Sequence, residues 1–269
     1  VLSYQFFPEG GMGYLLTRRD YNGNIDFSFG QNGMVELEPT IHTFNSPTGL
    51  LIQSDEKILI LGQAYGGNVL YPGYGVITRL TENGSYDINF GDNGVIVHQS
   101  EEYIGSQLED IDIQNDGKIV VCGTFIYENG TGGFAGSKPV VIRYHTTGVL
   151  DHDFGENGKV IFVQTVFNAN DGFRRIGFQN DGKIVLGGRA SFPYPYMRTY
   201  LYLTRIHPDG TKDASFGDNG VVYEDFTNTN SNNFTNYIEE MVISENGMIT
   251  VAGHKTDNMI FRETFITQF

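Results

Sequence analysis

The chain of 269 residues has no tryptophan and one cysteine, and it carries only 17 lysines and arginines against 32 aspartates and glutamates. The formal net charge of −15 argues against a nucleic-acid partner and against an anionic membrane surface, because phosphate groups are bound by basic surfaces. The single cysteine excludes a disulfide within the chain. Cys122 lies in the apolar run Ile119-Val120-Val121-Cys122, so we expect a small buried residue. No apolar run is long enough to cross a membrane, which argues against direct membrane insertion.

The chain is rich in glycine, with 35 residues, and it repeats one eight-residue motif. The motif, D-x-x-F-G-x-N-G, occurs four times, and its phenylalanines are 61, 64 and 62 residues apart. Such a regular period indicates a repeat protein, in which each unit buries its faces against its neighbours. The four copies span residues 26–33, 87–94, 151–158 and 213–220.

Each period contains four short runs that are rich in valine and isoleucine and bounded by Gly, Asn and Asp, which is typical of β-strands. In the second period these runs are 95–97, 108–113, 119–123 and 140–143. The turn Asn115-Asp116-Gly117-Lys118 separates two of these runs and predicts a hairpin. No segment shows a helical period with caps, so we expect almost no helix.

Four antiparallel strands in each period can stack linearly or radially. A linear stack leaves long exposed edges, whereas the blades of a β-propeller leave only short, protected ones. The repeat therefore predicts an all-β fold, a β-propeller of four-stranded antiparallel blades, with about five blades visible and the first and last of them incomplete. We expect residues 1–269 to form a single propeller or a segment of a larger one, because Val1 and Phe269 both fall inside the repeat. The expected units are approximately 23–83, 84–147, 148–209 and 210–269, preceded by a partial unit at 1–22.

The sequence pattern of the repeat resembles that of one known family. The residues that carry the resemblance are Thr78-Arg79, Gly84, Asp87, Phe90-Gly91 and Gly94, followed by Gln114, Asp116-Gly117-Lys118-Ile119-Val120 and Gly123. This pattern resembles the delta-60 repeat β-propeller family over essentially the whole chain. The resemblance implies a propeller fold in bacterial proteins, many of them large and secreted or displayed on the cell surface. It implies no catalytic residue.

An arginine and an aspartate recur eight residues apart, on either side of each glycine turn. A guanidinium–carboxylate pair at this spacing would brace the connection, and equal copies in every repeat suit a structural role better than a catalytic site, which is needed once. We expect the motif phenylalanine to be buried as a plug. The residues assigned to this structural repeat are Arg18, Asp26, Phe29, Arg79, Asp87, Phe90, Arg143, Asp151, Phe154, Arg205, Asp213 and Phe216.

Alternate connections of an up-and-down sheet lie on the same face, so the hairpin turns and the motif connections are expected to share one face. The remaining connections vary in length and sequence, and variable loops on a rigid scaffold are where binding sites are usually built. Tyrosines beside prolines in these loops suit sugars or protein partners, and an asparagine-rich loop suits glycans. The candidate ligand- or partner-binding residues are Tyr71, Tyr74, Phe192, Tyr194, Tyr196, Asn232 and Asn233.

Other chemistry has less support in the sequence. The histidines lack the spacing of a zinc site, no serine lies in a nucleophile elbow, and the acidic turns lack the order of an EF-hand. No catalytic residue, metal site or cofactor is therefore expected, with a weakly bound calcium ion at the turns left open. Asp110, Arg175 and Glu240 occupy equivalent positions on the predicted inner strands and are expected to line a central channel.

The sequence thus favours a protein that is not an enzyme. The first hypothesis is a non-catalytic binding or scaffold propeller of a bacterial protein that is extracellular, displayed on the cell surface, or carried on a phage or injection-system particle. Its partner would be a protein or a surface glycan, bound through the variable-loop face. Two alternatives stay open: a carbohydrate-binding, lectin-like propeller, and a propeller lyase or hydrolase that uses channel carboxylates such as Asp110 and Glu240.

Overall fold

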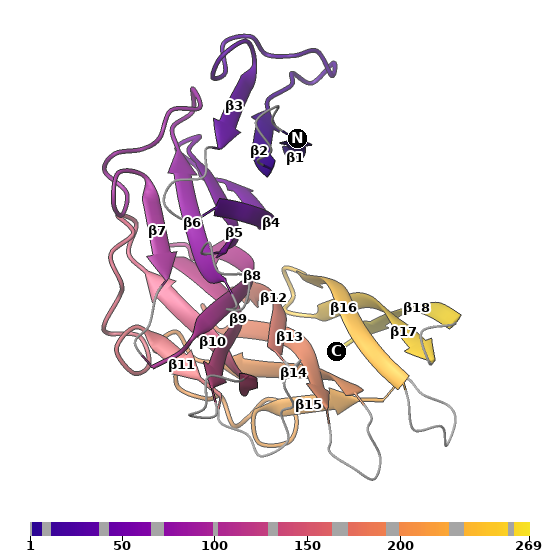
Figure 1. The fold of residues 1–269 in the computed structure, drawn as a ribbon. Coiled ribbons are helices and arrows are strands. Elements are labelled where there is room, and N and C mark those ends of the chain that lie inside the picture. The colour runs from indigo at the N-terminus through magenta and orange to yellow at the C-terminus, as the bar shows by residue number, and fades with distance from the viewer. Residues whose placement is uncertain are drawn as a thin grey trace. The chain divides into compact units, whose positions relative to one another are not determined.

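The computed structural model describes residues 2–6, 12–37, 43–65, 73–98, 102–128, 134–162, 172–191, 199–225, 234–257 and 261–269. Within these ranges the chain forms 18 β-strands and no helix (Figure 1). The described residues accordingly include no helix with the length and apolar character needed to cross a membrane. The fold is therefore all-β, as the repeat predicts.

The strands form five antiparallel sheets, and within each sheet the strands follow one another in chain order. Two sheets have three strands: β1 (Leu2–Phe6), β2 (Met12–Thr17) and β3 (Met34–Leu37), and β16 (Phe234–Ile243), β17 (Ile249–Asp257) and β18 (Phe261–Gln268). Three sheets have four strands. They are β4 (Thr43–Ile52), β5 (Ile58–Tyr65), β6 (Tyr74–Leu80) and β7 (Val95–His98); β8 (Gly105–Ile113), β9 (Ile119–Glu128), β10 (Phe134–Tyr144) and β11 (Lys159–Ile161); and β12 (Gly172–Phe178), β13 (Ile184–Ser191), β14 (Thr199–Ile206) and β15 (Val221–Glu224). A four-stranded antiparallel meander is the arrangement of a propeller blade.

The second strand of each four-stranded sheet is apolar at successive positions because both of its faces are covered. Strand β9 shows this most simply, since every residue from Ile119 to Ile126 is buried. Val120 and Cys122 of β9 share a core cluster with Phe154, Phe173 and Leu186, so neighbouring sheets pack on one another through a common core. Cys122 is fully buried, as its apolar run predicts.

The chain divides into two compact units. Unit 1 comprises Val1–Leu108 and Thr146–Val149, and it holds sheets β1–β3 and β4–β7. Unit 2 comprises Glu109–His145 and Leu150–Phe269, and it holds β9 to β18 together with the second half of β8. Each unit has core clusters of its own, one around Phe29 in unit 1 and one around Phe173 in unit 2.

The repeated motif clamps successive repeats together within each unit. In unit 2, Arg143 donates through Nε to Asp151 Oδ2 at 2.7 Å and through a terminal nitrogen to the carbonyl of Pro208 in the following repeat. The Arg143 guanidinium carbon lies 4.4 Å from the ring centroid of Phe154, which is fully buried. The same arginine–aspartate hydrogen bond joins Arg18 to Asp26 at 2.7 Å, Arg79 to Asp87 at 2.9 Å and Arg205 to Asp213 at 2.8 Å.

Lysines from the hairpin turns reach the same aspartates. Lys118 Nζ lies 3.0 Å from Asp151 Oδ2. The corresponding distances from Lys57 to Asp87 and from Lys183 to Asp213 are both 3.5 Å. The hairpin turn and the motif connection of a repeat therefore lie at the same end of the strands of its sheet, as the alternation of connections predicts.

Candidate functional site

Most of the predicted binding residues lie outside the described part of the chain. Tyr71, Phe192, Tyr194, Tyr196, Asn232 and Asn233 belong to this group, so the aromatic and asparagine-rich loops stay a prediction. Tyr74 is described: it begins β6, where it is half-buried and pairs with Ala64 of β5. Its part in binding also stays a prediction.

The first strands of the sheets in unit 2, predicted to be the inner strands, carry charged residues in adjacent pairs. The pairs Glu109-Asp110, Arg174-Arg175 and Glu239-Glu240 are spaced 65 residues apart, and we call these six residues the charged row. In β12 and β16 each pair coincides with a break in the strand register, which passes directly from Phe173 to Arg175 and from Ile238 to Glu240. Such a bulge inserts an unpaired residue and re-aims side chains. Strands β8, β12 and β16 thus present acid, base and acid in succession.

Asp110 is a half-buried carboxylate that connects β8 to β12. Its Oδ1 accepts a hydrogen bond from the backbone N–H of Ile111, and its Oδ2 accepts one from the N–H of Ile176, both at 3.0 Å. Burial raises the pKa of Asp110 to about 6, although the Ile176 hydrogen bond and the charge of Arg175 oppose the shift. A carboxyl group that titrates near neutral pH can act as a general acid or base.

Arg175 connects β12 to β16 and interacts with the charges of two carboxylates. One terminal nitrogen donates to the Arg174 carbonyl at 2.6 Å and the other donates to the Glu239 carbonyl. Its Nε lies 3.9 Å from Glu240 Oε2, and the Glu240 side chain is 65% exposed. Since Arg175 also acts electrostatically on Asp110, it brings these two carboxylates into one electrostatic environment.

Arg174 is a second cation of the row, with 38% of its side chain exposed. A terminal nitrogen lies 4.0 Å from Glu109 Oε2, and the guanidinium carbon lies 5.9 Å from the ring centroid of Tyr237 in β16. The Tyr237 ring stacks on the His254 ring with their centroids 4.7 Å apart, and His254 Nδ1 lies 2.7 Å from Glu239 Oε1. An exposed guanidinium held between an acid and an aromatic ring suits bidentate binding of a carboxylate or sulfate.

Two more titratable groups lie on β8 and β9. Burial raises the pKa of Asp112, opposed by a hydrogen bond from the Ile113 N–H. Burial, together with the charges of Asp110 and Glu109, raises the pKa of the Cys122 thiol, so this thiol stays protonated and unreactive. Across the ranges that the structure describes, no group of three or more His, Cys, Asp and Glu side chains could hold a metal ion.

We expect Asp110 to lower the stability of the fold as the pH rises. Its pKa is raised from 3.8 to about 6, so the folded state binds this proton more tightly than the unfolded chain does. The stabilisation from this group is complete below pH 3.8 and is lost as the pH rises through about 6. Two pKa units correspond to roughly 3 kcal/mol. Urea unfolding from pH 3.5 to 8 should show the stability difference between wild type and Asp110→Asn changing by that order, and a constant difference would contradict the shift.

The structure also shows which residues of this site the sequence analysis missed. Their equivalent positions in the repeat predicted Asp110, Arg175 and Glu240, which the structure connects through Arg175. The residues beside them in the chain were not predicted. The signal was available, because two like charges in succession break the alternation of a strand and indicate a bulge. The missed members of the charged row are Glu109, Arg174 and Glu239.

Comparison of the sequence with family models gives one match. The model described as "Domain of unknown function (DUF5122) beta-propeller" matches residues 114–154 and 179–216. Each matched segment begins at a hairpin turn and ends at the motif phenylalanine, Phe154 or Phe216. No curated protein matches the chain in sequence. These findings support a β-propeller repeat protein.

Three solved structures with a similar fold are named for enzymes. A polysaccharide lyase of family PL25, an ulvan lyase, is 10% identical, with a TM-score of 0.51 over 100% of this chain and 66% of that protein. The mannose phosphorylase MPT-4 from Leishmania mexicana is 13% identical, with a TM-score of 0.44 over 86% of this chain and 64% of that protein. A GH43 endo-arabinanase from Bacillus licheniformis is 11% identical, with a TM-score of 0.42 over 99% of this chain and 89% of that protein. The chain thus spans about two thirds of the length of the first two proteins.

The ulvan lyase corrects one conclusion drawn from the sequence. Regular blades without a recognisable catalytic motif indicated a protein that is not an enzyme, and that inference was wrong. The ulvan lyase, which has a similar fold, is an enzyme, so a fold of this kind does not exclude catalysis. At these identities the likeness concerns the fold, and the chemistry has to be argued from the residues of this chain.

Proposed function

We propose that the chain is a carbohydrate-active propeller, which binds an acidic polysaccharide at the charged row of unit 2 and cleaves a glycosidic bond there. The observation that carries the proposal is Asp110, a half-buried carboxyl with a pKa of about 6, which accepts a hydrogen bond from the Ile176 N–H and feels the charge of Arg175. The ulvan lyase, which has a similar fold and was also solved bound to a saccharide of glucuronic acid and sulfated rhamnose, supports the choice of substrate class.

The position of each residue in the charged row indicates its role in binding or cleavage. Arg174, with its exposed guanidinium, binds the carboxylate or sulfate of the sugar. Asp110 supplies the proton that the departing sugar oxygen gains when the glycosidic bond breaks, whether by elimination or by hydrolysis. Arg175 holds β12 and β16 in register and positions Glu240. Glu240, the second carboxylate of the site, takes the proton that the attacking water loses in hydrolysis or that the sugar carbon beside the carboxylate loses in elimination.

The proposal includes a location. Polysaccharides are too large to enter a cell intact, so the chain would meet its substrate outside the cell or at its surface. The net charge of −15 would repel an acidic polymer over most of the surface, which gives the arginine pair a specific role in attracting it.

The test is an activity assay with the full chain on uronate-containing, sulfated and neutral polysaccharides. Ultraviolet absorbance of unsaturated products reports elimination, and new reducing ends report hydrolysis. Asp110→Asn should lower the rate about a hundredfold, since general acid catalysis contributes at least that much. Wild-type kcat/KM should fall above about pH 6, where Asp110 loses its proton.

Asp112→Asn is the matched control, because Asp112 lies on the same strand and also has a raised pKa. Its rate should stay within about threefold of wild type. Arg174→Ala should raise KM for the acidic substrates and leave kcat nearly unchanged. The proposal is wrong if no polysaccharide is cleaved, or if Asp110→Asn cleaves as fast as the Asp112 variant.

A further inference from the structure

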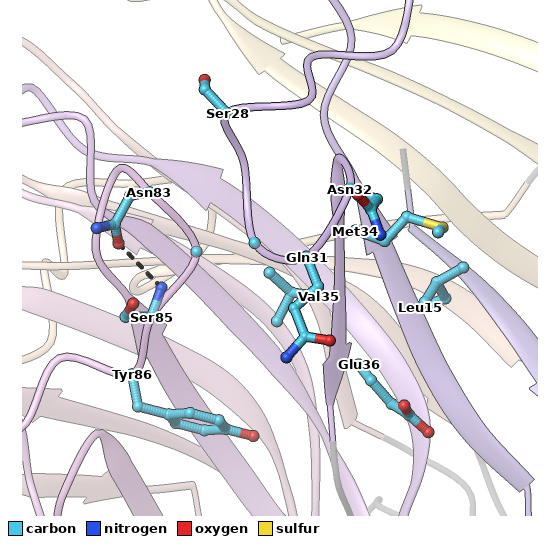
Figure 2. Close-up of a pocket in the computed structure, with 12 residues that line it drawn as sticks. Leu15, Ser28, Gln31, Asn32, Met34, Val35, Glu36, Asn83, Ser85 and Tyr86 are labelled. Atoms are coloured by element: carbon cyan, nitrogen blue, oxygen red, sulfur yellow. Dashed lines mark hydrogen bonds between the residues drawn. The ribbon is translucent and has the colours of Figure 1, made fainter.

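Unit 1 contains a cavity that none of the site residues named so far lines. It has a volume of about 890 Å³ and lies between the motif connection of the first repeat and the glycine turn of the second. The sheet β1–β3 and its motif connection contribute Leu15, Ser28 and residues 30–36 apart from Gly33, and the turn after β6 contributes residues 83–86. Figure 2 shows the Gln31 amide between the Tyr86 ring on one side and the Glu36 carboxylate on the other.

The backbone at this junction is the same as at the other junctions. Gly30 N–H donates to the Asn83 carbonyl at 2.8 Å. The equivalent bonds join Gly91 to Thr147 at 3.0 Å and Gly155 to Asp209 at 2.9 Å. Because backbone atoms make this contact between repeats, the side chains around the cavity can differ from one junction to the next.

The side chains at this junction differ from those of the later repeats. Gln31 stands where later copies have Asp92, Glu156 and Asp218. Tyr86 stands where they have Leu150 and Lys212, and Glu36 stands where they have Val97, Ile161 and Tyr223. The first junction thus has an amide in place of an acid, and a tyrosine and a glutamate in places that are elsewhere aliphatic, basic or aromatic.

The lining combines the groups that recognise a sugar. Gln31, Asn32 and Asn83 supply amides that both donate and accept, and Ser28 and Ser85 supply hydroxyls. Tyr86 packs against the core cluster of unit 1 that contains Val35, which fixes an aromatic surface beside these polar groups. Among the described residues that line the cavity, Glu36 is the one charged side chain, so no cation is there to attract an anion.

We infer that this cavity is a binding site for a neutral saccharide, separate from the charged row of unit 2 and independent of the cleavage proposed there. A neutral sugar needs paired donors and acceptors around its hydroxyl groups and an apolar surface against its C–H face. The cavity offers both. Bound at this site, a neutral glycan would hold the protein on its polysaccharide without passing through the acid–base site.

The experiment titrates the full chain with neutral gluco-, manno- and xylo-oligosaccharides and with an oligouronide, using calorimetry and saturation-transfer NMR. At least one neutral oligosaccharide should bind, and the oligouronide should bind this site at least tenfold more weakly. Gln31→Asp and Tyr86→Leu introduce residues that later repeats already have at these positions, so both variants should fold. Each should weaken binding of the neutral sugar at least tenfold.

The control is the double variant Glu156→Gln and Lys212→Tyr, which places the same residue types at one junction of unit 2 and should leave binding unchanged. Asp110→Asn should also bind the neutral sugar normally, so loss of cleavage and loss of this binding are separate results. Absence of binding by any neutral oligosaccharide would overturn the inference. Undiminished binding by both Gln31→Asp and Tyr86→Leu would overturn it as well.

Discussion

Replacement of Asp151 by Asn is expected to destabilise unit 2 by about 3–5 kcal/mol, the loss that follows when one partner of a buried ion pair is removed. The Asp151 side chain is fully buried and receives Arg143 at 2.7 Å and Lys118 at 3.0 Å. The Arg143 side chain is only 7% exposed, so without the carboxylate its charge would remain buried and partly unpaired. Since a whole domain is stable by about 5–15 kcal/mol, this one charge is a large share of the total. Urea unfolding followed by tyrosine fluorescence would measure the loss, because the chain has no tryptophan.

Asp26→Asn is the matched control. Asp26 has the same place in the first motif and the same bond to Arg18 at 2.7 Å, but the two side chains are 30% and 36% exposed. Water screens such a pair, so its loss should be much smaller. Equal losses in the two variants would show that burial does not decide the strength of the clamp.

The pH dependence gives a second check on Asp151. Burial opposes its ionisation, but the hydrogen bonds from Lys118 and Arg143 outweigh burial and hold the pKa of Asp151 below its usual value of 3.8. A carboxylate with a lowered pKa stabilises the fold above 3.8, and this stabilisation is lost as the pH falls through the lowered value. Wild type and Asp151→Asn should therefore converge in stability toward acid pH, and a gap that stays constant would contradict the ionic explanation.

The period and the sequence pattern of the repeat were enough to predict the all-β architecture. The residues of each copy determine where the turns lie, which phenylalanine is buried and how long the strands are. Every copy has nearly the same residues at these positions. The pairing of hairpin and motif connections on one face also followed, because it depends only on the alternation of strands. The contacts of Lys118 with Asp151 agree with that reasoning.

The two candidate sites depended on information that the repeat does not carry. The pKa of Asp110 reflects how deeply β8 is covered and where the Ile176 N–H points, and both depend on tertiary packing. The cavity in unit 1 depends on Tyr86 in a place where the next repeat has Leu150. For the cavity, departures from the repeat were thus the available signal. The binding role of the variable loops stays a prediction.

Replacement of Gly210 by Ala is expected to cost about 2–5 kcal/mol of stability, because two separate penalties fall on one residue. Gly210 has φ of +91°, and a left-handed backbone costs an L-residue with a side chain roughly 1–2 kcal/mol. A Cβ atom there would lie 2.8 Å from Gly155 N and 2.9 Å from Val160 Cγ2, so the turn would have to move off the preceding motif. Overpacking of this kind typically costs about 1–3 kcal/mol more. The hydrogen bond from Gly155 N to the Asp209 carbonyl would be strained at the same time.

Gly23 separates the two penalties. It is the equivalent glycine of the first repeat and has φ of +86°, yet a Cβ atom there would meet no other described atom within 4 Å. Gly23→Ala should therefore show the backbone penalty alone, about 1–2 kcal/mol. Thermal and urea unfolding of both variants would measure the difference, which is the cost of disturbing the contact between successive repeats. If the two variants lose the same stability, the glycine is required by the turn itself, and the close approach of neighbouring repeats contributes nothing to its selection.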